Sequence, residues 1–144
     1  MGKARVTAFV AAVSIMAGSA WAQDVIAQRK QLMREQGAAT APVGRMLNGG
    51  EPFDMAKTQA ALDAYLHTTR EFRSLFPAGS DQGQTRAAPA IFQDREKFDA
   101  AVAKFEADTT AAKNAIKDEA SFKAEMPKVL ANCGTCHTAF RTSR

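Results

Sequence analysis

The sequence predicts an all-α protein that folds as an antiparallel up-down-up-down four-helix bundle. Four stretches repeat apolar residues at spacings of three and four, which is the period of an amphipathic helix. No stretch shows a convincing strand pattern. The connections between the four stretches are mostly short, which favours antiparallel neighbours. The chain has 144 residues, a length that a single domain accommodates.

The N-terminus has the layout of a secretory signal peptide, and this segment comes before the first predicted helix. Lys3 and Arg5 form a basic start, residues 6–17 are mostly apolar, and Ala20-Trp21-Ala22 supplies a small-x-small cleavage pattern. The apolar run is too short to span a bilayer, which needs roughly 20 residues. An uncleaved anchor or a buried helix is the alternative interpretation. We expect residues 1–22 to be removed, which leaves residues 23–144 as one domain.

The net charge argues against a nucleic-acid partner. The whole chain carries a formal charge of +4, and loss of Lys3 and Arg5 leaves +2. Such a weak positive balance does not indicate nucleic-acid binding. No second hydrophobic run is long enough for a membrane span, so we expect no stable membrane insertion after cleavage.

The first two predicted helices cover residues 24–48 and 54–76. Pro42 is expected to bend or break the first helix, and a glycine-rich loop ends it. A polar loop over residues 77–84 follows the second. The apolar faces of the two helices contain Val25, Ile26, Leu32, Met33, Val43, Met46, Leu47, Leu62, Tyr65, Leu66, Phe72 and Phe76.

The third predicted helix starts at Pro89, a residue suited to a first turn. One row of side chains repeats every seven residues, as the seam of a bundle helix does: Ile91, Phe98, Phe105 and Ala112. A second row interleaves with it: Arg95, Val102, Thr109 and Ile116. The fourth helix covers residues 121–141, with a kink expected at Pro127.

A short motif near the C-terminus carries the chemistry. Residues 133–137 read Cys-Gly-Thr-Cys-His, and these two cysteines are the only ones in the chain. Cys-x-x-Cys-His is the attachment signature of c-type haem. On a helix, residues three and four apart lie on the same side. Cys133 and Cys136 can therefore reach the two vinyl groups of a porphyrin while His137 turns toward the iron.

Other interpretations of the motif are weaker. A disulfide between residues three apart would close a tiny loop and constrain little. A thioredoxin-like pair would need a βαβ context. A zinc site needs four ligands, and Cys133, Cys136, His137 and the distant His67 would supply them with strain at two adjacent positions. A chance match is disfavoured because the motif uses both cysteines of an exported chain on an apolar helix face.

The position of the motif adds a family resemblance. A helical bundle with this motif at its extreme C-terminus resembles a class II cytochrome c, the cytochrome c prime family. The ending Thr138-Ala139-Phe140-Arg141 is similar to the family's closing pattern, an aromatic residue and then a basic one. The loop Gly50-Glu51-Pro52-Phe53-Asp54 resembles the family's loop before its second helix. The resemblance covers essentially residues 23–144.

The resemblance implies one covalently bound haem c, with His137 as the proximal iron ligand. The family divides on the other side of the iron. Five-coordinate members place an apolar residue there and bind nitric oxide or carbon monoxide, whereas low-spin members place a methionine there and carry electrons. The family position falls on Met33 in this chain, so the sequence most resembles the low-spin, methionine/histidine-ligated members. A thioether ligand raises the reduction potential, although methionine on an apolar face is often core filler.

Three further residues receive roles from the resemblance. Arg29 lies one turn before Met33 and matches a basic residue near a haem propionate, with a solvated surface arginine as the alternative. Phe140 is expected against the porphyrin edge and Arg141 near the proximal imidazole. His67 is interpreted as a surface histidine.

The sequence shows no general acid–base pair, no activated nucleophile and no phosphate-binding loop. We therefore expect a non-enzyme: a periplasmic monohaem electron carrier. The partners would be periplasmic redox proteins, and the resemblance implies a homodimer through the first two helices. The alternatives are a five-coordinate cytochrome c prime that binds nitric oxide or carbon monoxide, and a helical bundle without a cofactor. Lys128, Arg141 and Arg144 gather basic charge near one end of the last helix.

Overall fold

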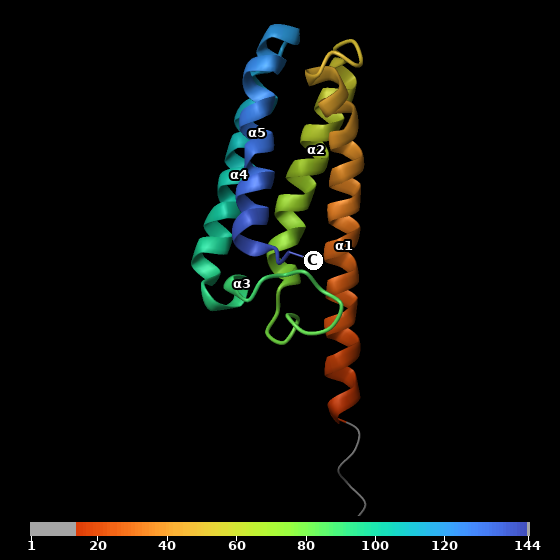
Figure 1. Ribbon diagram of the computed structural model, residues 1–144, viewed down its shortest axis with the longest axis vertical. Helices are drawn as coiled ribbons and strands as arrows, with labels where there is room; N and C mark the ends of the chain where they lie inside the picture. Colours follow the sequence, from red (N-terminus) through yellow and green to blue (C-terminus); the bar gives the residue numbers. More distant parts are fainter. Residues whose placement is uncertain (1–13, 144) are drawn as a thin grey trace, which may run out of the picture.

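Four long helices run alternately up and down, as the sequence predicts (Figure 1). The structure is a computed structural model that describes the backbone of residues 14–143 and the side chains of residues 21–143. The long helices are α1 (Ser14–Leu47), α2 (Met55–Phe72), α4 (Arg95–Ala115) and α5 (Glu119–Phe140). No strand occurs in the described part of the chain. The predicted all-α four-helix bundle is confirmed.

The second and third predicted helices are each divided in the structure, and α1 and α5 begin before the predicted residues 24 and 121. The second helix tightens at its end into a 3-10 turn, η1 (Arg73–Leu75). The third is divided into a single turn, α3 (Ala90–Gln93), and α4, because Asp94 leaves the helical conformation. The Asp94 carboxylate accepts a hydrogen bond from the Lys97 backbone N–H and so caps α4. Pro89 consequently lies at the N-cap of α3 and not in a first turn.

The proline residues do not end the helices that contain them. Helix α1 continues through Pro42 and α5 through Pro127. A proline removes one backbone hydrogen bond, and the flanking turns retain theirs. Residues 1–13 of the predicted signal segment lie outside the described residues, while residues 14–22 form the first turns of α1. The expected cleavage after Ala22 therefore falls within α1. Among the described residues, no helix combines the length and apolar character of a membrane span.

The four long helices contact one another in the order α1, α2, α4, α5, and α1 and α5 make few contacts with each other. Helix α1 packs chiefly on α2, α2 also packs on α4, and α4 packs on α5. Helices α1 and α5 are therefore joined mainly through α2 and α4. This arrangement holds the two helices that carry the candidate iron ligands apart from each other.

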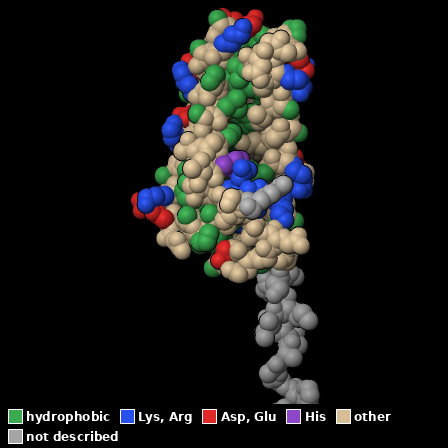
Figure 2. All heavy atoms as spheres, in the orientation of Figure 1, with side chains coloured by type: hydrophobic (Ala, Val, Ile, Leu, Met, Phe, Trp, Pro, Cys, Tyr) green, Lys and Arg blue, Asp and Glu red, His purple; other side chains and the backbone are tan. Residues whose placement is uncertain are grey.

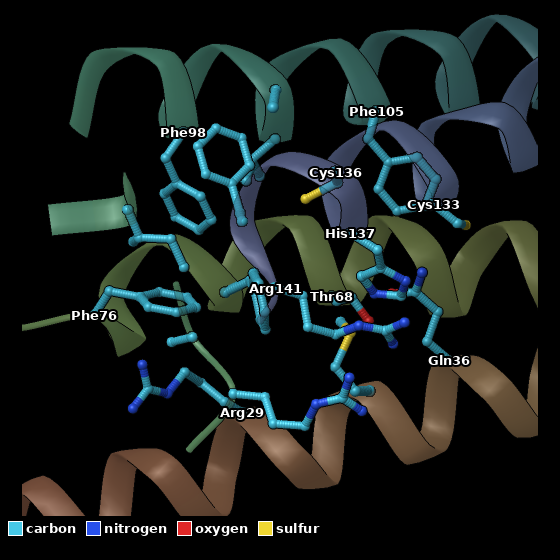
Figure 3. Close-up of a pocket in the computed structure, with 18 of the residues that line it drawn as sticks. Arg29, Gln36, Thr68, Phe76, Phe98, Phe105, Cys133, Cys136, His137 and Arg141 are labelled. Atoms are coloured by element: carbon cyan, nitrogen blue, oxygen red, sulfur yellow. The ribbon is translucent and has the colours of Figure 1, made fainter. Parts of the chain in front are cut away.

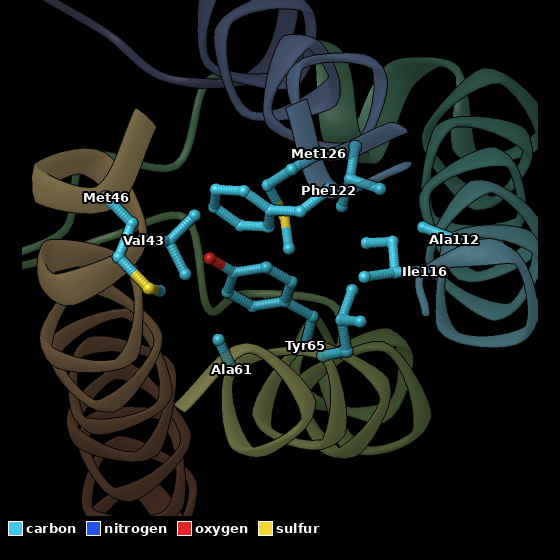
Figure 4. Close-up of a cluster of buried hydrophobic side chains, with 10 residues drawn as sticks. Val43, Met46, Ala61, Tyr65, Ala112, Ile116, Phe122 and Met126 are labelled. Carbon is cyan, nitrogen blue, oxygen red and sulfur yellow. The ribbon is translucent and has the colours of Figure 1, made fainter. Parts of the chain in front are cut away.

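A first buried cluster, the upper core, fills the bundle near the α1–α2 and α4–α5 turns (Figure 4). Tyr65 is fully buried at its lower edge, and its hydroxyl lies 2.8 Å from the Thr40 hydroxyl of α1. This hydrogen bond satisfies a polar group that would otherwise be costly to bury. The upper core consists of Val43, Met46, Ala61, Leu62, Tyr65, Ala112, Ile116, Phe122, Met126 and Val129.

A second buried cluster, the lower core, lies at the opposite end of the bundle and is dominated by aromatic rings. The Phe76 and Phe98 ring centroids are 4.7 Å apart in an edge-to-face arrangement, which such pairs prefer. The predicted seven-residue seam spans both cores, although Phe105 is only half-buried and Arg95 of the interleaved row is exposed. The lower core consists of Val25, Leu32, Leu75, Phe76, Ile91, Phe98 and Val102.

Truncation of the upper core is expected to destabilise the bundle. Phe122 is fully buried and packs against Phe53 at a centroid distance of 5.3 Å. Phe122→Ala should lower the free energy of unfolding by about 3–5 kcal/mol because it leaves a cavity. Lys123→Ala, on the exposed side of the same turn, should change it by no more than about 0.5 kcal/mol. Urea denaturation followed by circular dichroism measures both, and equal losses would contradict this packing.

Candidate functional site

A cavity of about 540 Å³ lies between the two cores and is lined from α1, α2, α4 and α5 (Figure 3). Its volume is within the roughly 300–1,000 Å³ typical of ligand and cofactor sites. Most of its lining is apolar or aromatic. The structure brings all the sequence-predicted site residues together around this cavity: Arg29, Met33, Cys133, Cys136, His137, Phe140 and Arg141.

Helix α5 directs the Cys-x-x-Cys-His motif toward the cavity because the start of the helix and its rotation about its own axis are both fixed. A reciprocal capping box between Asp118 and Ser121 starts the helix. Val129, fully buried one turn before the motif, turns that face inward. The Asn132 side-chain amide donates to the Asp108 carboxylate of α4 at 2.8 Å. The helix therefore cannot rotate without losing an inter-helix hydrogen bond.

The two thiols and the imidazole are half-buried and face the cavity (Figure 3). Both cysteines are free, so no disulfide joins them in the structure. Burial raises the pKa of Cys133 and of Cys136, which keeps both as neutral thiols. Burial, and after it the nearby Arg141 and Arg86 cations, lower the pKa of His137. The neutral imidazole that results is the form that binds a metal.

Met33 approaches the same cavity from α1, the helix opposite α5. It is half-buried. The other three methionines among residues 21–143 lie elsewhere. Met46 and Met126 belong to the upper core and Met55 packs against it, and the Met46 sulfur accepts the Asp54 backbone N–H at 3.2 Å.

Arg29 is a buried cation with unsatisfied donors. Its side chain is 5% exposed, and one nitrogen donates to the Ser80 carbonyl at 2.6 Å. Its guanidinium lies 4.5 Å from the centre of the Phe76 ring, a cation–π distance. The Nε and Nη1 atoms are buried without a hydrogen-bond partner. Burial lowers the pKa of Arg29, while Asp81 opposes this shift. The solvated-surface interpretation of Arg29 does not fit this burial.

The end of α5 is attached to a distant segment. Ala87 and Arg141 form an isolated antiparallel bridge, with the Ala88 N–H donating to the Phe140 carbonyl at 3.0 Å. The Phe140 ring packs edge-to-face on Phe98 at 5.4 Å. These contacts bring the Arg86 and Arg141 side chains to the cavity next to His137.

The sequence analysis did not single out three residues that line the cavity: Gln36, Arg86 and Ala87. Gln36 lies one turn after Met33, so helical spacing alone would find it. Its side-chain oxygen is buried without a hydrogen-bond partner. Arg86 and Ala87 reach the site through the bridge to Arg141, a long-range contact that no local pattern indicates.

The zinc alternative finds no support in the geometry. His67 is exposed and lines a different, smaller cavity with Gln28, Glu35 and Glu71, away from the cysteines. Among the residues that the structure describes, no three His, Cys, Asp or Glu side chains are grouped to hold a metal.

Comparison with known proteins identifies the family to which a chain with this fold and cavity belongs. The family model described as "Cytochrome C'" matches residues 24–141. A cytochrome c′ of Rhodopseudomonas palustris is 44% identical over 144 residues, covering 99% of each chain. A cytochrome c-556 of Agrobacterium fabrum is 31% identical over 131 residues, covering 90% of this chain and 89% of that protein. The structure of R. palustris cytochrome c′ superposes with a TM-score of 0.81 at 46% identity, covering 84% of this chain and 98% of that one.

The fold and site therefore define a class II, haem-binding four-helix bundle, an architecture for which cytochrome c′ is itself a standard example. The chain belongs to the cytochrome c′ family. Members of this family bind one covalently attached haem c. The residues of the cavity can therefore be compared with what a haem group requires.

The residues around the cavity fit such a group. Haem is flat and mostly apolar, and the cavity is mostly apolar and lined by aromatic rings. Haem carries two carboxylates, and Arg29 offers two buried donors without a partner. Two free thiols and an imidazole with lowered pKa complete the donor set that covalent attachment and iron ligation need.

Removal of both thiols should abolish covalent attachment. In Cys133→Ala/Cys136→Ala, any haem that remains should be extracted by acid–acetone, because no thioether can form. Thr135→Ala is the matched control, since Thr135 lies within the motif but is exposed and bonds only to the Ala131 carbonyl. The pyridine haemochrome spectrum of the polypeptide fraction measures bound haem. Full retention in the double variant would contradict the site.

Loss of the buried cation should lower the reduction potential. A positive charge beside haem favours the reduced form, which carries one positive charge less. Arg29→Gln should therefore shift the potential downward, and Arg70→Gln, which changes an exposed arginine of α2 outside the cavity, should not. Spectroelectrochemical titration compares the two. Equal potentials in both variants would place Arg29 away from the haem.

Proposed function

We propose that this chain is a periplasmic monohaem c-type cytochrome that carries electrons. Haem is attached at Cys133 and Cys136, with His137 as the proximal and Met33 as the distal iron ligand. The observation that carries the proposal is that Met33 lines the same cavity as the Cys-x-x-Cys-His motif, from the opposite helix. The remaining methionines of residues 21–143 lie in or against the upper core.

The nature of the ligand pair supports electron transfer over gas binding. Haem supplies the one-electron chemistry when it is bound. A methionine sulfur opposite a histidine raises the potential and leaves no open position for an exogenous ligand. Met33 and His137 project from different helices, and neither helix packs chiefly on the other. A flat group between them can therefore be held from both sides.

The other residues of the cavity bind and shield the group. Arg29 would bind a propionate through its free donors, in charge-assisted hydrogen bonds. Phe98 and Phe140 form a packed aromatic pair beside the motif, which keeps water from that side.

The cellular location and the oligomeric state of the protein are inferred from the N-terminal segment and from the family resemblance. The N-terminal segment has a signal-peptide layout, so we infer export to the periplasm and partners among periplasmic redox proteins. By family resemblance the molecule forms a homodimer through α1 and α2. Cytochrome c′ proteins are in general non-enzymatic haem proteins, and we extend this to the chain.

The second candidate is a five-coordinate cytochrome c′ that binds nitric oxide or carbon monoxide. The relative with 44% identity is named cytochrome c′, whereas the relatives named cytochrome c-556 are 28–33% identical. In this alternative, Met33 packs against the haem and leaves the iron open. The two candidates differ only in whether a sulfur–iron bond forms.

The spin state of the iron distinguishes the candidates. We expect the wild-type protein to be low-spin when oxidised and when reduced, and to bind carbon monoxide slowly or not at all. Met33→Leu should open the sixth position, give a high-spin spectrum, lower the potential and admit carbon monoxide. The volumes of the two side chains are close, so the change in packing alone should cost less than about 1.5 kcal/mol.

Met46→Leu is the matched control, because Met46 lies in the upper core outside the cavity. It should leave the absorption spectrum of both oxidation states unchanged. A wild-type protein that is already high-spin and binds carbon monoxide readily would favour the gas-binding alternative.

A further inference from the structure

The charged residues around the cavity all have the same sign. Its lining contains five basic residues and no aspartate or glutamate. Figure 2 shows lysine and arginine side chains gathered beside a histidine on the corresponding face. Arg29 is buried, while the other four are exposed. We call these four the basic rim: Lys30, Arg34, Arg86 and Arg141.

None of these five cations forms an ion pair with a carboxylate of the described residues. The structure forms nine ion pairs there, all of which use other basic residues. Outside the cavity, Arg70 and Lys117 alone among the described lysines and arginines lack such a pair. The paired cations are Arg45, Lys57, Arg73, Arg95, Lys97, Lys104, Lys113, Lys123 and Lys128.

The contacts that the rim residues do make leave their charge intact. Arg86 donates twice to the Thr142 carbonyl, at 3.1 and 2.8 Å, and Arg34 donates to the Gln31 side-chain oxygen at 2.5 Å. Both acceptors are neutral. Arg34 on α1 and Arg86 in the segment joined to the end of α5 are thus held by neutral acceptors and keep their positive charge.

The two propionates of a haem group cannot neutralise all five cations around the cavity. Each haem propionate can neutralise one cation, and the buried Arg29, with two unpaired donors, is the best placed to bind one. More than one exposed cation of the rim remains even when both propionates are paired. Unpaired like charges repel one another, and a protein that concentrates them at one opening creates a local field for an anionic partner.

We propose that the basic rim is the docking surface for an acidic patch on a redox protein, which it brings to the opening of the haem cavity. The proposal rests on the proposed electron-transfer function and names the chemistry of the partner. Of the residues that gather basic charge in the sequence, Lys128 is bonded to Glu125 in an ion pair of 2.8 Å and so does not contribute, and Arg144 lies outside the described residues.

Two outer-sphere oxidants of opposite charge measure the field at the rim. Hexacyanoferrate(III) is an anion and tris(1,10-phenanthroline)cobalt(III) is a cation, and each takes one electron from the reduced holoprotein. The net charge of residues 23–144 is only +2. A much faster reaction with the anionic oxidant than with the cationic one must therefore come from local charge. Rates with the anion should fall as ionic strength rises, and rates with the cation should rise.

Reversal of the charge of two rim residues should remove the preference for the anionic oxidant. At low ionic strength, Lys30→Glu/Arg34→Glu should slow oxidation by hexacyanoferrate(III) by about tenfold or more. The control Arg70→Glu/Lys117→Glu has the same net charge, and its two sites are exposed and outside the cavity. It should slow the reaction by less than about twofold. Equal slowing in the two double variants would overturn the proposal, because only net charge would then matter.

An acidic peptide tests the kind of partner. A deca-glutamate peptide titrated into ¹⁵N-labelled reduced holoprotein should shift the backbone amides of residues 30, 34, 86 and 141 and leave those near Lys117 in place. A deca-lysine peptide should shift none of the four. Shifts centred on Lys117, or none at the rim, would overturn the docking surface. Binding of the peptide depends on the surface charge and not on the sixth iron ligand, so a high-spin iron would refute the electron-carrier function without deciding this proposal.

Discussion

The bundle is organised around one constraint: α5 must hold two thiols and an imidazole on the face that lines the cavity opposite α1. The usual solution for a helical bundle is to fill its centre with side chains. Here the packing order, α1 on α2, α2 on α4 and α4 on α5, keeps α1 and α5 apart at mid-height. The cavity of about 540 Å³ remains between them, with the upper core on one side of it and the lower core on the other.

Three features near the motif fix the walls of the cavity. The Asn132–Asp108 hydrogen bond fixes the rotation of α5 against α4. The bridge between Ala87 and Arg141 attaches the far end of α5 to the segment before α3. Arg29 is buried beside Phe76, although two of its donors lack partners. A buried cation with free donors is costly in isolation, and an anionic group in the cavity would offset that cost.

Much of the fold follows from local patterns, and the exceptions have identifiable causes. The three-and-four spacing predicts the four long helices, and Cys133, Cys136 and His137 share one face by helical geometry alone. The division at Asp94 was not predicted, because a capping carboxylate competes with continuation of the helix there. Met33 could be placed only through its resemblance to a family position. Arg86 reaches the site through a contact more than fifty residues away in sequence, which no periodicity encodes.

The intact mass of the purified protein under denaturing conditions tests the central claim most directly, since only covalent bonds survive. The account predicts the mass of residues 23–144 plus one haem, with the added mass confined, after proteolysis, to the peptide that contains Cys133 and Cys136. A polypeptide without the added mass, or haem that separates on denaturation, would contradict it. The cavity would then not be the site of a thioether-bound haem.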